Sequence, residues 1–149
     1  MKIKFTSQVL IASILLHAST SAQPVIKGDK AIGGSGPDIL LSMCSTKDGG
    51  LIAGGKSWSN QSYEKTQNSR GGADYWVVKM DKRGKIQWDE TIGSSGDDNY
   101  KSVIQTLDGG YALIGESFSN ISGEKSENSR GGTDYWMVKL DSMGNFSVG

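Results

Sequence analysis

Histidine and cysteine are almost missing from this chain of 149 residues, and each absence excludes a class of chemistry. The one histidine, His17, lies in an N-terminal segment that we expect to be removed. A mature chain without it excludes a histidine general base, a Ser-His-Asp triad and a histidine metal ligand. The one cysteine, Cys44, cannot form an intrachain disulfide. With no histidine to activate it, Cys44 is expected to be a packing residue rather than a nucleophile.

Apolar runs long enough to cross a bilayer are also missing, since a spanning helix needs about 20 residues. The longest candidate is Val9–Leu16, which follows Lys2 and Lys4 and precedes small residues up to Ala22. This order is that of a secretory signal peptide. We therefore predict a signal peptide over 1–22, a mature region over 23–149 that is secreted or at the cell surface, and no stable membrane span.

An excess of positive charge is lacking as well. Without the predicted signal peptide the chain carries 14 basic and 16 acidic residues, a net charge of about −2. Such a balance gives no basic surface to hold a polyphosphate backbone, which argues against a nucleic-acid partner.

What the chain does have is an internal repeat with a period of 60 residues. Residues 32–89 align with 92–149 without a gap, and 29 of the 58 pairs are identical. We therefore divide the region into repeat one, 32–91, and repeat two, 92–149. A repeat of this length is expected to form one structural unit per copy.

Each repeat is predicted to form four antiparallel strands, because aromatic and β-branched runs alternate with Gly and Asp turns. The expected strands are Ile39–Ser45, Leu51–Ser57, Asp74–Met80 and Lys85–Ile92 in repeat one, and Asn99–Gln105, Tyr111–Ser117 and Asp134–Leu140 in repeat two. The turns Asp48–Gly50 and Asp108–Gly110 read "DGG", which is typical of hairpins. Val25–Ile32 lies one period before Lys85–Ile92, so we expect an additional N-terminal fourth strand.

The motifs "DGGY", "IGSSGDD" and "GGTDYWMVKLDSMG" resemble the repeats of secreted bacterial β-propeller proteins, many of which gram-negative bacteria export through type IX secretion. The resemblance covers residues 25–149. It implies an all-β, propeller-like fold with four-stranded antiparallel blades, here two repeats plus an N-terminal fourth strand, a partial propeller. Propellers have about four to eight blades. We therefore expect a fragment of a longer protein, closure by self-association, or a marginal open pair whose tryptophans need neighbours on both faces.

Two short motifs are similar to a phosphate-binding loop and to a calcium-binding loop, but neither predicts such a site. "GLIAGGKS", Gly50–Ser57, fits the phosphate-loop pattern, but it lies along a predicted strand and Glu116 stands at the position of Lys56 in the other repeat. "GSSGDDNY", Gly93–Tyr100, offers oxygens to Ca²⁺ but lacks the alternating acids of a dedicated calcium loop. We predict no cofactor, no metal site and no catalytic residue.

The long polar stretches Ser59–Gly72 and Ser119–Gly132 are the best candidates for a binding surface, since loops of this length often bind ligands. The predicted binding residues are three aromatic side chains and two arginines: Trp58, Tyr63, Phe118, Arg70 and Arg130. Aromatic rings here can stack on sugars, or simply anchor solvated loops. The arginines can bind carboxylate or sulfate groups, or pair with an acid of the same blade.

The expected function is an exported, noncatalytic binding or scaffold module with a glycan or protein ligand on the long-loop face. The alternative is the N-terminal propeller portion of a secreted hydrolase or lyase. Acids that recur in both repeats occupy equivalent environments, which favours turns and caps over the unequal carboxylates of a glycosidase.

Overall fold

The computed structural model describes residues 28–147, so the predicted signal peptide lies outside the described residues. The chain divides into two units, Met1–Lys30 and Ala31–Gly149. All contacts reported below lie within the second unit. In the part of the chain that the structure describes, no helix is long and apolar enough to cross a membrane.

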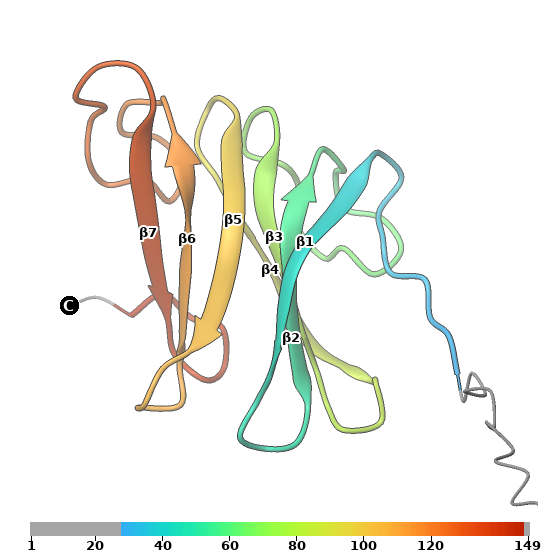
Figure 1. Ribbon diagram of the computed structural model, residues 1–149. Coiled ribbons are helices and arrows are strands. Elements are labelled where there is room, and N and C mark those ends of the chain that lie inside the picture. Colours follow the sequence, from blue (N-terminus) through green and yellow to red (C-terminus); the bar gives the residue numbers. More distant parts are fainter. Residues whose placement is uncertain (1–27, 148–149) are drawn as a thin grey trace, which may run out of the picture. The chain divides into compact units, whose positions relative to one another are not determined.

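Within the second unit, the described residues 31–147 form seven strands in two antiparallel sheets, which confirms the predicted all-β class. Sheet one has the order β1-β2-β3-β4, and sheet two has the order β5-β6-β7 (Figure 1). The strands are β1 Asp38–Ser45, β2 Leu51–Ser57, β3 Asp74–Met80, β4 Ile86–Ile92, β5 Asp98–Gln105, β6 Tyr111–Ser117 and β7 Asp134–Leu140.

Up to residue 147, where the described part of the chain ends, sheet two shows the beginning of a fourth strand. Phe146 pairs with Leu140, and the Ser147 amide donates to the Lys139 carbonyl at 3.0 Å. The same position in sheet one is the pair of Met80 with Ile86, where β4 begins.

The additional N-terminal strand is not formed by residues 28–32, the part of it that the structure describes. Residues 28–32 form no strand, and residues 25–27 of the predicted strand Val25–Ile32 lie outside the described residues. A strand exists only by hydrogen bonding to a neighbour. The sequence period predicts a strand-like pattern, but it does not supply the neighbouring strand.

Two tight hairpins carry the same side-chain scaffold. Gly49 and Gly109 have φ values of 79° and 87°, which glycine adopts without steric cost. Asp48 Oδ1 accepts the Gly50 amide at 3.0 Å and the Thr46 hydroxyl at 2.5 Å. The Lys79 ammonium lies 2.8 Å from Asp48 Oδ2, and this contact, with the Thr46 hydrogen bond, lowers the pKa of Asp48. The "DGG" turns are therefore structural, as predicted.

The apolar core lies between the two sheets, where β5 contacts β1, β2 and β3 (Figure 1). Its fully or almost fully buried members come from both sheets: Ile52, Tyr75, Val77, Ile92, Tyr100, Val103, Tyr111, Leu113, Val138 and Leu140. The rings of Tyr75 and Tyr100 meet edge to face, with centroids 5.4 Å apart. Each of these two repeats therefore uses one sheet face to cover the other.

Trp76 overturns one expectation about the propeller-like packing. The side chain is only 7% exposed, although it lies on the face of sheet one that points away from sheet two. Its own repeat covers it: the Lys65 ammonium lies 5.6 Å from the ring centroid, and the indole N–H donates to Asp89 Oδ2 at 2.9 Å. A neighbouring blade is thus not required to keep this tryptophan dry.

Candidate functional site

The two long loops occupy the same end of their sheets. Each connects the second strand of a sheet to the third, so it leaves at the end opposite the "DGG" hairpins (Figure 1). We call this end the long-loop rim, defined by residues 33–37, 58–73, 93–97 and 118–133. Loops that share one end of a sheet stack can form a common surface.

A pair of asparagines clasps each long loop. Asn68 Oδ1 accepts the Gln61 amide at 3.0 Å, and Asn60 Oδ1 accepts the Ser69 amide at 3.3 Å. Asn128 and Asn120 make the same two bonds in repeat two, at 3.1 and 3.2 Å. The recurrence of both asparagines in the two repeats was the sequence signal for these hydrogen bonds. The bonds show that the loops are ordered structures rather than solvated linkers.

Tyr63 lies at the tip of the first long loop, in a turn closed by two hydrogen bonds between Ser62 and Lys65. Its φ is 49°, the only positive value of a non-glycine residue among those described, and its side chain is 85% exposed. The same position in repeat two is Gly123, with a φ of 54°. The turn therefore needs a left-handed residue, and only repeat one places an aromatic side chain on it.

Trp58 and Phe118 occupy equivalent positions just after the second strand of each sheet. They are 39% and 46% exposed. The Lys56 ammonium lies 5.5 Å from the Trp58 ring centroid, within range of a cation–π contact. Both rings thus remain accessible at the rim.

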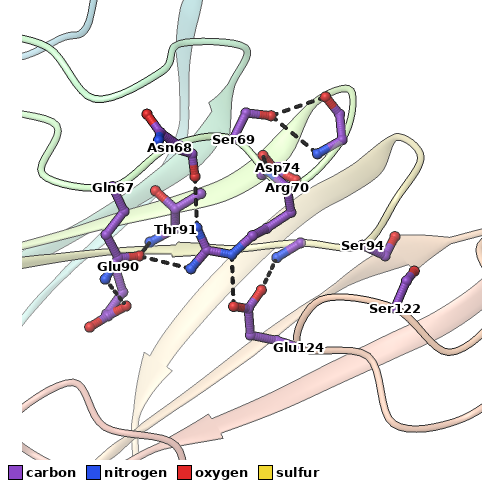
Figure 2. A network of polar contacts seen from close by, with 12 residues as sticks. Gln67, Asn68, Ser69, Arg70, Asp74, Glu90, Thr91, Ser94, Ser122 and Glu124 are labelled. Atoms are coloured by element: carbon purple, nitrogen blue, oxygen red, sulfur yellow. Dashed lines mark hydrogen bonds and ion pairs between the residues drawn. The ribbon is translucent and has the colours of Figure 1, made fainter.

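The two predicted arginines have different surroundings. Arg70 Nε lies 2.8 Å from Glu124 Oε1, and its other nitrogens donate to the Asn68 carbonyl and to Gln67 (Figure 2). Glu124 Oε2 in turn accepts the Gly93 amide at 3.0 Å. The ion pair therefore joins the two repeats, whereas we expected an acid of the same blade as the ordinary partner.

Arg130, the counterpart of Arg70, is exposed. Its side chain is 83% accessible, and its ion pair is with Glu127 of the same repeat at 3.5 Å. In the part of the chain that the structure describes, no hydrogen bond, ion pair or ring contact joins any two of the five predicted binding residues. They share a rim but form no single cluster.

Acids at the rim accept hydrogen bonds from backbone amides, among them Asp98 and Asp74, which recur in both repeats, and Asp97, whose counterpart is Pro37. Asp97 accepts the Ala73 amide at 2.7 Å, and Asp98 accepts the Ser94 amide at 2.5 Å. Asp74 accepts the Arg70 amide at 2.8 Å, and burial raises the pKa of its carboxyl group. Over residues 28–147, no group of three or more His, Cys, Asp or Glu side chains is placed to hold a metal ion.

A groove of about 450 Å³ runs beside β7, lined mainly by Lys125, Glu127, Arg130, Asp134 and Trp136. In sheet one the corresponding place is taken by β4. There Lys65 donates to Thr91, and the Thr66 amide donates to Asp89 at 3.0 Å. The groove therefore lies where a fourth strand of sheet two would pair with β7.

No protein-family model matches this chain, and no curated protein sequence is significantly similar to it.

Proposed function

We propose that the protein is an exported, noncatalytic binding or scaffold module whose long-loop rim binds a glycan or a protein. The observation that carries the proposal is Tyr63, an aromatic side chain that is 85% exposed on a left-handed backbone. Left-handed backbone disfavours any residue with a Cβ by about 1–2 kcal/mol. Strain of this kind is concentrated at functional sites.

The comparison with repeat two strengthens this argument. Gly123 forms the same turn without a side chain, so the loop does not need an aromatic ring to fold. Exposed to this degree, the ring of Tyr63 adds little packing energy to compensate for the strain. A flat ring with a terminal hydroxyl is suited to stack on a sugar face or to anchor a protein contact.

The neighbouring acids Asp97 and Asp98 at the rim support a noncatalytic role. A pair of catalytic carboxylates needs two different environments and access to a substrate. Asp97 instead accepts the Ala73 amide of a neighbouring loop, and Asp98 accepts the Ser94 amide of its own loop and is fully buried. These groups hold the rim in shape, which is what a binding surface requires.

We further propose that the two sheets are blades of a propeller-like stack, and that the stack continues beyond them. The support is the way sheet one and sheet two cover each other, together with apolar side chains on their outer faces, such as Leu40 and Met137. Further blades come either from self-association or from further repeats.

The rim proposal is tested by probing the purified chain on a glycan array and against a panel of extracellular matrix proteins. We expect the wild type to bind, and Tyr63→Ala and Tyr63→Gly to lose at least about tenfold in affinity, because truncating an aromatic hot-spot residue costs about 2 kcal/mol or more and tenfold corresponds to about 1.4 kcal/mol. Arg83→Ala, in a turn at the opposite end of the sheet, is the control and should bind as the wild type does. Binding that is unchanged in both Tyr63 variants, or no binding by the wild type, would contradict the proposal.

A further inference from the structure

Residues on the outer face of each sheet are exposed, whereas their counterparts one repeat away are buried in the contact between the sheets. On sheet two, Tyr135 is 88% and Met137 is 68% exposed, whereas their counterparts in sheet one, Tyr75 and Val77, are fully buried. We call this outer face of β6 and β7 the second face, defined by Ala112, Ile114, Tyr135 and Met137.

Sheet one shows the converse on its own outer face. Leu40 and Met43 are 60% and 56% exposed, whereas their counterparts Tyr100 and Val103 are 1% and 3% exposed against sheet one. We call this outer face of β1 and β2 the first face, defined by Leu40, Met43, Ala53 and Gly55. The chain thus carries both halves of its own inter-sheet contact, one at each side.

We propose that the protein binds a second copy of itself head to tail, with the second face of one copy against the first face of the next. This contact repeats the one that joins sheet one to sheet two. The inference rests on the proposed propeller-like stacking, and it is independent of what the long-loop rim binds.

The first match between the two faces is a tyrosine above a glycine. Across the observed contact, Tyr75 lies over Gly115, where an added Cβ would come within 2.4 Å of the tyrosine oxygen. The Tyr75 hydroxyl donates to the Trp136 carbonyl at 3.2 Å. The same pair across two copies is Tyr135 over Gly55. Both residue types are retained, so Tyr135 of one copy can pack over Gly55 of the next as Tyr75 packs over Gly115.

The second match is a compensating exchange of size. In the observed contact Tyr100 lies over Gly54, and an added Cβ there would come within 2.2 Å of the tyrosine oxygen. Across two copies the same position pairs Leu40 with Ile114. The smaller residue has become larger on one face, and the larger has become smaller on the other. A gain in size on one face is thus met by a loss in size on the facing side chain, the direction of change that apolar packing tolerates best.

The third match is electrostatic. Arg70 and Glu124 join the two repeats at 2.8 Å, and their counterparts across two copies are Arg130 and Glu64. Glu64 Oε2 already lies 3.4 Å from the Gly33 amide, as Glu124 Oε2 lies 3.0 Å from the Gly93 amide. The acid is therefore placed as in the observed pair, and Arg130 is exposed at the other side.

The proposed contact joins two different surfaces, so one copy can bind a neighbour on each side. Heterologous contacts of this kind close into a ring when the rotation per copy allows it, and otherwise extend as a filament. Such contacts also cover exposed apolar side chains on both outer faces, such as Leu40, Met43 and Met137.

A mixing experiment with the full chain, expressed with its own N-terminal segment, tests the head-to-tail geometry. One variant carries Leu40→Asp and Met43→Asp and blocks the first face; the other carries Tyr135→Asp and Met137→Asp and blocks the second. All four positions are exposed, so circular dichroism should match the wild type. Leu107→Asp, which alters a residue 97% exposed in a hairpin turn, is the control and should assemble as the wild type does.

In analytical ultracentrifugation we expect the wild type to form species larger than one chain, and each blocked variant to be a monomer. An equimolar mixture of the two blocked variants should give a dimer and nothing larger, since one intact face remains on each. A monomeric wild type would overturn the proposal, and the two faces would then be left for further repeats to cover. So would a mixture that stays monomeric, or blocked variants that assemble as the wild type does.

A charge exchange tests the register independently. Arg130→Glu or Glu64→Arg alone places like charges together and should weaken assembly about three- to tenfold. The double variant restores an opposite pair and should recover most of the loss. Additive weakening in the double variant would overturn the predicted pairing. The monomeric blocked variants should still bind glycan or protein at the rim. Binding assays on these variants therefore test the rim proposal separately from self-association.

Discussion

At the scale of single residues, Tyr63 places stability and binding in opposition. Its φ of 49° suits glycine, which the other repeat uses at this position. We expect Tyr63→Gly to be about 1 kcal/mol more stable than Tyr63→Ala, because alanine keeps the left-handed strain and glycine removes it. Urea unfolding followed by tryptophan fluorescence measures the difference. Equal stabilities of the two variants would show that the turn carries no strain at this residue.

Asp74 gives a prediction about pH. Its side chain is fully buried, and Oδ1 has no hydrogen-bond partner among the described residues. Burial raises its pKa, so the folded state binds the proton more tightly than the unfolded state does. Stability is therefore lost as pH rises from the unfolded Asp pKa of about 3.9 towards the raised folded value. We expect Asp74→Asn, which removes the charge, to gain stability relative to the wild type between pH 4 and pH 7.

Asp134, the same position in repeat two, is the matched control with the opposite sign. Hydrogen bonds from the Arg130 amide and the Ser129 hydroxyl lower its pKa. A lowered pKa contributes stability above the unfolded value, and that stability is lost as pH falls through the folded value. Asp134→Asn should therefore be less stable than the wild type above the unfolded Asp pKa of about 3.9, by an amount that stays constant up to pH 7 and shrinks as pH falls below 3.9. Urea midpoints at several pH values compare the two variants; parallel trends would refute the assignment.

At the scale of strands, Gly54 of β2 is where one sheet admits a side chain of the other. An alanine Cβ there would meet the buried ring of Tyr100, with its oxygen at 2.2 Å. We expect Gly54→Ala to lower the free energy of unfolding by about 1–3 kcal/mol, the range for overpacked cores. Ile114→Ala is the control at the same repeat position, where the side chain is 37% exposed, and should change stability by less than about 1 kcal/mol. Chemical denaturation would show whether the two differ.

The strands were largely predictable from local patterns because each is bounded by turns with specific chemistry. The second and third strands of both repeats match the expected bounds, and the fourth strand begins at Ile86 rather than Lys85. Alternation of apolar residues and the "DGG" turns are local signals. Strand formation by Val25–Ile32 depends on a neighbouring strand elsewhere, and residues 28–32 form no strand.

The rim was predictable in position but not in its contacts. Two loops of equal length at equivalent positions fix which end of the sheets carries them, and the exposed aromatics follow from that placement. The partner of Arg70 does not follow, because Glu124 is 54 residues away and belongs to the other repeat. Likewise, the cover that Lys65 gives Trp76 depends on how the loop folds back over its own sheet. Spacing along a chain carries no information about such contacts.

At the scale of the whole unit, the two sheets share one core instead of having one each. Tyr75 and Val77 of sheet one pack with Tyr100, Val103 and Leu113 of sheet two in a single cluster. Neither sheet can expose this face without uncovering the other. A repeat pair that buries most of its apolar core at the mutual contact is expected to unfold as one cooperative unit.

That coupling can be measured with Val77→Ala, a change confined to sheet one. Val77 is fully buried, so we expect a loss of about 2 kcal/mol, and the loss should appear in both sheets because they unfold together. Amide hydrogen exchange resolved by residue should show reduced protection in β6 as well as in β2 and β3. Met137→Ala, at the equivalent exposed position, is the control and should leave exchange in both sheets nearly unchanged in dilute solution. Loss of protection confined to sheet one would mean that each sheet is stable alone, and that the shared core does not couple them.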